Sequence, residues 1–147
     1  MHIPRFEIRL RPGPWTSFLL CVLILTVPLT WLAAWLVSVT VHELGHLLMT
    51  RILGISVYGV SVGLSGASIE TEPMVPWQAL LCSAAGPLAG ALLISLRHYL
   101  PLPALFAYFH TLWNLIPFGA HDGARILTAL WEMVRKIPCK PGQERIQ

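Results

Sequence analysis

Charged side chains are scarce in this chain. Of its 147 residues only 12% are charged, whereas 55% are hydrophobic. Soluble domains carry about 25% charged residues, so the composition excludes an ordinary soluble domain and favours an integral membrane protein. The length is that of one domain, and we predict a single domain over residues 1–147.

Cysteine and aspartate are also scarce. The three cysteines (21, 82 and 139) are far apart, which excludes a readable disulfide framework or a CxxC metal site. The only aspartate is Asp122, and it lies within an apolar run. An ionisable group in such a run is costly, and it is a candidate functional residue for that reason.

Charge is concentrated at the two ends of the chain. The net charge is +3, and seven of the basic residues precede or follow the apolar runs: Arg5, Arg9, Arg11, Arg135, Lys136, Lys140 and Arg145. A basic balance can indicate nucleic acid, but this placement more simply orients a chain in a bilayer. We therefore expect a lipid bilayer and no nucleic acid as the partner.

Four apolar segments predict an all-α polytopic membrane protein. A helix needs about 20 residues to cross a bilayer. The predicted spans lie near residues 15–31, 32–52, 77–98 and 103–133, followed by a short tail at 134–147. Pro28 ends the first span, which is short enough that a three-span alternative with a re-entrant first segment stays open. Pro117 interrupts the fourth.

The spans also predict the orientation of the chain. An even number of spans places both termini on one side, and the basic ends identify that side as the cytoplasm. We therefore expect a protein integral to a bacterial cell membrane, with both termini cytoplasmic.

Two segments predict a small membrane-associated sheet. Residues 5–11 alternate apolar and charged side chains with a period of two, and residues 56–70 contain a second alternating run around a glycine turn. An amphipathic surface segment is the alternative for 5–11. Both segments fall on the cytoplasmic side of the predicted spans.

The sequence HELGH, residues 42–46, places ionisable groups inside the second span. Apart from the thiol of Cys21, no other ionisable side chain lies between Gly13 and Thr50. On a helix His42 and His46 face the same way and can bind one zinc ion at about 2.0–2.1 Å. Glu43 then lies beside the metal, where a general base is needed to take a proton from water. A short motif can arise by chance, but three uncompensated ionisable groups in a membrane helix favour a function.

A catalytic zinc ion uses three protein ligands, so a third is required. Asp122 is the predicted third ligand, because it and the histidine pair lie at similar depths, roughly 9–17 Å inside the membrane. His121 is the alternative ligand, and His110 is a more distant one. We expect one Zn²⁺ per chain, held by His42, His46 and Asp122.

Together these motifs resemble a known family. HELGH is followed by Asn114, Pro117, Asp122 and Gly123 in the spacing N-x-x-P-x-x-x-x-D-G, which is similar to the site-2 protease family of intramembrane zinc metalloproteases. The small-residue segment 84–90 also resembles the middle helix of that family. The layout is closest to the compact bacterial type, which includes a sporulation protease that processes a sigma-factor precursor.

The resemblance implies a reaction and roles for residues. It implies hydrolysis of peptide bonds in or near transmembrane segments of membrane-tethered protein substrates, with Glu43 as general base. Asn114 is expected to bind the substrate or the oxyanion, and residues 57–64 are expected to pair with the unwound substrate. A regulatory membrane protein is a further expected partner, but its identity is not readable.

Three other functions stay open at this point. The first is a catalytically silent zinc-binding membrane scaffold that binds client proteins. The second is a small metal-ion carrier, and the third is another membrane HExxH peptidase with a glutamate as third ligand.

Overall fold

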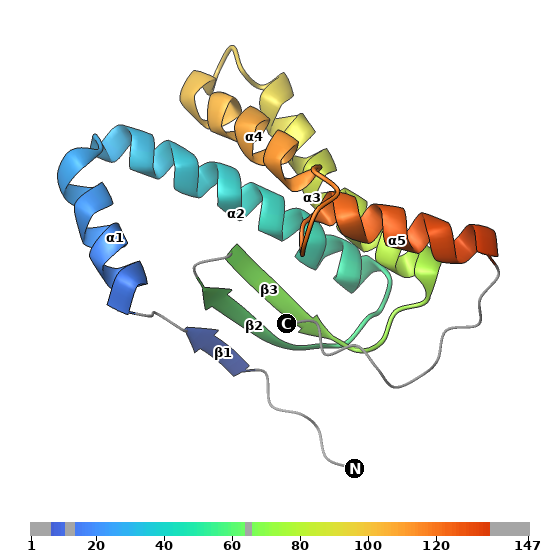
Figure 1. Cartoon of the computed structure of the whole chain (residues 1–147). Coiled ribbons are helices and arrows are strands. Elements are labelled where there is room, and N and C mark those ends of the chain that lie inside the picture. Colours follow the sequence, from blue (N-terminus) through green and yellow to red (C-terminus); the bar gives the residue numbers. More distant parts are fainter. Residues whose placement is uncertain (1–6, 11–13, 64–65, 136–147) are drawn as a thin grey trace.

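The structure is a computed structural model that describes residues 7–10, 14–63 and 66–135 (Figure 1). It is mostly helical with one small sheet, as the sequence predicts. The elements in chain order are β1 (Glu7–Leu10), α1 (Pro14–Thr26), α2 (Leu29–Ile52), β2 (Val57–Gly63), β3 (Gly66–Thr71), α3 (Pro76–Ser95), α4 (Pro101–Asn114) and α5 (Asp122–Arg135). Most of the predicted tail lies outside the described residues.

Prolines mark where the helices begin. Pro28 is the residue before α2 and separates it from α1, as expected from the sequence. Pro76 and Pro101 occupy the first turns of α3 and α4. Proline fits there because its fixed φ suits a helix and its missing N–H would have no partner in the first turn.

Two of the described helices are long and apolar enough to cross a membrane. They are α2, with 24 residues, and α3, with 20. Helix α1 has 13 residues and α4 and α5 have 14 each, so each is shorter than the roughly 20 residues of a full crossing. The predicted fourth span is divided into α4 and α5 by residues 115–121, around Pro117.

The sheet has three strands in the order β1-β2-β3. Strand β2 pairs in parallel with β1 along Gly59–Val62 and antiparallel with β3. The described part of segment 5–11 is thus a strand and not an amphipathic surface segment. The expected pairing of substrate with residues 57–64 is wrong, because β2 is the central strand and both of its edges are already used.

Helix α3 is at the centre of the bundle and packs against α2, α4 and α5 (Figure 1). Its contact with α2 depends on small residues. A Cβ atom added to Gly45 would lie 2.6 Å from the carbonyl oxygen of Ala85 and 2.8 Å from the Cβ of Ala89. Small residues at such a crossing let the two backbones approach closely.

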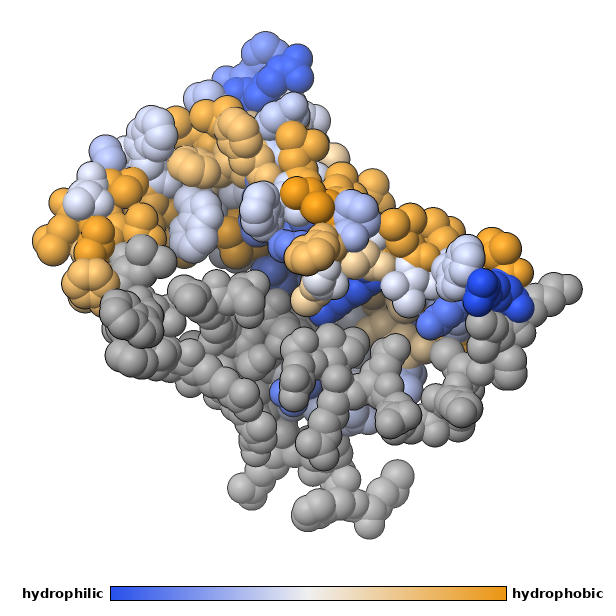
Figure 2. Space-filling model, in the orientation of Figure 1, coloured by the Kyte–Doolittle hydropathy of each residue, from blue (hydrophilic) through white to orange (hydrophobic). Residues whose placement is uncertain are grey.

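Large apolar side chains point outward and small ones inward, which is the reverse of a soluble core. Leu25 is 85% exposed and Leu92 is 67% exposed. The buried apolar residues are mostly small: Ala34, Ile55, Cys82, Ala85, Leu93, Ala104, Ala107 and Ala129. Figure 2 shows the hydrophobic outer faces of the helices and a hydrophilic cap at the end where α3 joins α4. Helices that meet lipid are packed in this way.

Replacing Gly45 with alanine is expected to destabilise the protein by about 1–3 kcal/mol, because the added methyl group forces α2 and α3 apart. Thermal unfolding in detergent, followed by circular dichroism, measures the loss. The control is Gly54→Asn: Gly54 has a φ of 68° and open space around it, and asparagine tolerates that conformation. Equal stability of Gly45→Ala and wild type would contradict the tight crossing.

Candidate metal centre

The site lies where α2, α3 and the start of α5 meet. His42 and His46 lie one turn apart on α2, and Asp122 is the first residue of α5. His42 is 2% exposed and Asp122 is 5% exposed. Two helices that are distant in the sequence therefore bring three ligand-type side chains together in a buried place.

Three donor atoms form a compact triangle. The Nε2 atom of His42 lies 2.9 Å from Oδ2 of Asp122, and the Nε2 atom of His46 lies 3.2 Å from that same oxygen. The two Nε2 atoms are 3.2 Å apart. Two atoms bound tetrahedrally to zinc at 2.0–2.1 Å are about 3.3 Å from one another, so the triangle has the size that a zinc ion requires.

The hydrogen bonding of His46 also fits a cation. Its Nδ1 donates to the carbonyl oxygen of Cys82 at 2.7 Å. In the neutral ring Nε2 then carries a lone pair, and this lone pair faces the carboxylate of Asp122. Two electron-rich atoms at this distance need a proton or a cation between them. The donor set therefore fits a metal ion, and the bond to Cys82 is the kind that orients a metal-binding histidine.

Helix α3 leaves room for the group because Gly86 has no side chain. A Cβ at Gly86 would lie 2.7 Å from Nε2 of His42 and would overlap the ring of His46. The small-residue segment 84–90 thus does more than allow close helix packing. At Gly86 it provides the wall against which both imidazoles lie.

The turn between α4 and α5 places Asp122. Gly119 adopts a φ of 61°, and a Cβ at Gly123 would overlap the carbonyl oxygen of Leu115. The chain therefore folds back tightly before α5 begins. Asp122 stands at the positive end of the α5 dipole, which stabilises a carboxylate.

The two alternative ligands are not part of this triangle. The ring of His121 packs edge-on against Trp113, with 5.8 Å between centroids. His110 packs against the ring of His42 at 4.7 Å, but Asn114 donates a hydrogen bond to its Nε2. Within the described residues, the group that could hold a metal ion consists of His42, His46 and Asp122.

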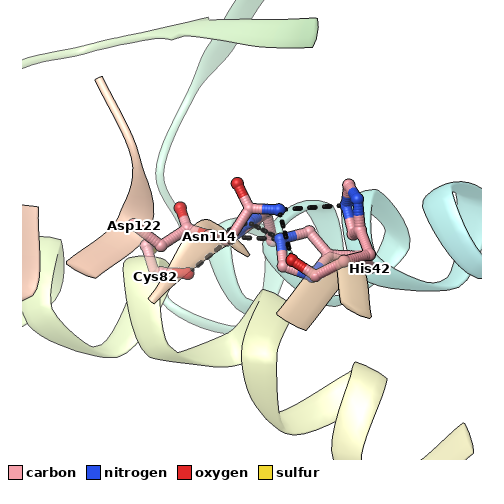
Figure 3. Close-up of polar contacts among 6 residues, drawn as sticks. His42, Cys82, Asn114 and Asp122 are labelled. Atoms are coloured by element: carbon pink, nitrogen blue, oxygen red, sulfur yellow. Dashed lines mark hydrogen bonds and ion pairs between the residues drawn. The ribbon is translucent and has the colours of Figure 1, made fainter. Parts of the chain in front are cut away.

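Asn114 and Glu43 lie around this group. The side-chain amide of Asn114 donates to the carbonyl oxygen and to the ring of His110, at 3.1 Å each. Figure 3 shows Asn114 in the same cluster as His42 and Asp122. Glu43 is half-buried and close enough to interact electrostatically with both histidines and with Asp122.

Two parts of the site were missed by sequence reasoning. The sequence analysis uses Cys82 only to exclude a disulfide framework or a CxxC metal site, yet its carbonyl oxygen orients His46. The role of a backbone carbonyl cannot be inferred from the residue type, because every residue has one. His110 was considered only as a ligand, whereas it stands between His42 and Asn114.

The chain was compared with known families, proteins and solved structures. No family model matches the chain. A protein of Synechocystis sp. named "Putative zinc metalloprotease sll0528" is 33% identical over 113 residues, which is 65% of this chain and 30% of that protein. The structure of Site-2 Protease from Methanocaldococcus jannaschii matches with a TM-score of 0.68 and 22% identity, over 90% of this chain and 70% of that one.

The described architecture therefore has the fold of that solved protease. The name of the Synechocystis relative agrees with the zinc-protease motifs in the sequence. This chain spans less than a third of the Synechocystis protein. The similarity therefore does not by itself assign the activity of that whole protein to this chain.

Replacing Gly86 with alanine is expected to weaken zinc binding at least about 10-fold, the scale of changes made directly around metal ligands. The new methyl group would displace both imidazoles. Elemental analysis and chelator competition on the purified protein measure the effect. Ala91→Leu adds bulk on the exposed side of α3 and is expected to leave zinc binding unchanged. A Gly86→Ala protein with full zinc affinity would contradict this arrangement of α3 and the ligands.

Replacing Asp122 with alanine is expected to remove most of the bound zinc, because one of the three proposed ligands is lost. His121→Ala is the matched comparison and is expected to retain the zinc content of wild type. Metal analysis of the two variants side by side shows whether Asp122 or His121 is the third ligand. Loss of zinc in His121→Ala with retention in Asp122→Ala would reverse the assignment.

Proposed function

We propose that this chain is an intramembrane zinc metalloendopeptidase that hydrolyses peptide bonds in or near transmembrane segments of membrane-tethered substrates. The observation that carries the proposal is the triangle of donor atoms from His42, His46 and Asp122, with sides of 2.9, 3.2 and 3.2 Å. We assign one Zn²⁺ per chain to it. The similarity to named proteases supports the same reaction.

The cell membrane is the proposed location. The exposed leucines of the helices and the small buried residues support helices that face lipid on the outside. Both termini are assigned to the cytoplasmic side because of their basic residues. A substrate that reaches a site buried among these helices must itself be in the membrane.

The catalytic roles follow from what each group can donate or accept. A bound zinc ion supplies a Lewis acid that acidifies water and polarises a carbonyl group. Glu43 takes a proton from the attacking water and later returns it to the leaving amine. Asn114 donates a hydrogen bond to the substrate carbonyl, for which it must release one of its two bonds to His110.

A catalytically silent scaffold is the second candidate function. A structural zinc site is normally closed by four protein ligands. Among the described residues this group contains three, and the half-buried carboxylate of Glu43 lies close by. Three ligands and a nearby base favour the peptidase.

Replacing Glu43 with glutamine is expected to lower peptide-bond cleavage by about 100-fold or more, the scale of general acid–base catalysis, while zinc stays bound. Cleavage is measured on a single-span substrate protein in proteoliposomes, with zinc content determined on the same samples. Glu132→Gln makes the same chemical change on α5 and is expected to cleave like wild type. Undiminished cleavage by Glu43→Gln would rule out the proposed mechanism.

A further inference from the structure

Three buried polar atoms near the metal centre have no hydrogen-bond partner among the described residues. They are Oγ of Ser38, Nδ1 of His42 and Oγ1 of Thr111. These residues are 1%, 2% and 8% exposed. Buried polar atoms in folded proteins are nearly always hydrogen-bonded, so three such atoms in one region point to a shared cause.

The two hydroxyl groups are unusual for helical residues. A serine or threonine in a helix can donate to the carbonyl oxygen one turn earlier, and several in this chain do so. Examples are Thr26 to Val22, Ser95 to Leu92 and Thr128 to Ala124, at 2.7, 2.6 and 2.9 Å. Ser38 and Thr111 have no such bond, so their hydroxyl groups are available to another partner.

Both hydroxyl groups come from helix positions next to those that surround His42. Ser38 is one turn before His42 on the same face of α2, and side chains at that spacing are neighbours. On α3, Gly86 lies against Nε2 of His42, and Gly90, one turn later, lies against Oγ1 of Thr111. Thr111 also follows His110, whose ring packs on that of His42.

His42 needs a hydrogen-bond acceptor at this place once its Nε2 binds the proposed zinc ion. Its Nε2 is the ring nitrogen next to Asp122 and His46, so metal binding there leaves the proton of the neutral ring on Nδ1. A metal-binding histidine almost always donates its other N–H to an acceptor, which fixes the tautomer and the ring orientation. His46 has the carbonyl oxygen of Cys82 for this purpose, and among the described residues His42 has no equivalent carbonyl partner.

We propose that one buried water molecule accepts the Nδ1–H of His42 and donates to the hydroxyl oxygens of Ser38 and Thr111. A buried water typically makes about three hydrogen bonds to groups of this kind. Ser38 and Thr111 are then positioning residues that hold the imidazole in the tautomer whose Nε2 faces the metal. This inference rests on the proposed function and adds to it the groups that orient one ligand.

The first test is the zinc affinity of Ser38→Ala, measured by chelator competition in detergent. The expected result is a 10- to 100-fold weaker affinity, the usual effect of removing a hydrogen-bond partner of a metal ligand. Alanine removes a single oxygen atom and is a better helix former than serine, so the variant is expected to fold. Ser95→Ala makes the same change where the hydroxyl already donates to Leu92, and it is expected to bind zinc like wild type.

The opposite result is expected if the hydroxyl group of Ser38 has no partner in the folded protein. Ser38→Ala would then be more thermostable than wild type, because a buried polar group without a partner is removed, and its zinc affinity would be unchanged. That combination would overturn the proposal.

Thr111 gives a second and independent test. Thr111→Val keeps the shape and removes the hydroxyl, whereas Thr111→Ser keeps the hydroxyl. We expect weaker zinc binding in the valine variant and recovery in the serine variant. The visible spectrum of the Co²⁺-substituted protein should shift in Ser38→Ala and Thr111→Val together. The double variant Ser38→Ala/Thr111→Val tests whether the two hydroxyl groups share one network. If its loss of zinc-binding free energy equals the sum of the two single losses, a shared network is overturned.

The two proposals fail in different ways. A wild-type protein that binds no zinc, or a Glu43→Gln protein that still cleaves, contradicts the proposed function. A zinc-binding, cleaving wild type with unchanged affinity in Ser38→Ala and Thr111→Val contradicts only the role of the two hydroxyl groups.

Discussion

The structure depends on placing electron-rich atoms next to one another inside an apolar bundle. Two imidazole nitrogens and a carboxylate oxygen lie within 3.2 Å of each other, and none of them is well solvated. Such an arrangement is costly without a cation or a proton, because a low-dielectric environment strengthens repulsion as well as attraction. The features around the site serve this requirement: Gly86 makes space, the Cys82 carbonyl orients one ring, and the α5 dipole supports the carboxylate.

Backbone irregularity at α4–α5 is part of the same design. A continuous helix over residues 103–133 would fix the direction of Asp122 by helical periodicity alone. The break around Pro117 and Gly119 instead makes Asp122 the first residue of a new helix. Irregular backbone within a membrane is tolerated only when it is buried in protein or lines a wet cavity. The proposed hydrolysis needs such a cavity, so the break in the helix is compatible with that reaction.

Much of this could be predicted from the sequence, for physical reasons. HELGH on a helix fixes the mutual position of two side chains, and a lone aspartate in an apolar run is costly unless it meets a cationic partner. The break between α1 and α2 at Pro28 follows from the fixed φ and the missing N–H of proline. The position of β2 between two neighbours could not be predicted, because strand order depends on how distant segments meet. Contacts of backbone atoms could not be predicted either, because residue types do not indicate them. The hydrogen bond to the Cys82 carbonyl and the contact of Gly86 with both rings are therefore known only from the structure.

The parallel pairing of β1 with β2 has a consequence for sidedness. The two strands are joined through α1 and α2, yet they share one sheet. In the proposed membrane placement the sheet lies at one membrane surface, because an open sheet edge is not stable in the hydrocarbon region. The chain would then leave that surface and return to it through α1 and α2, and α1 would reach only as far into the membrane as its 13 residues allow.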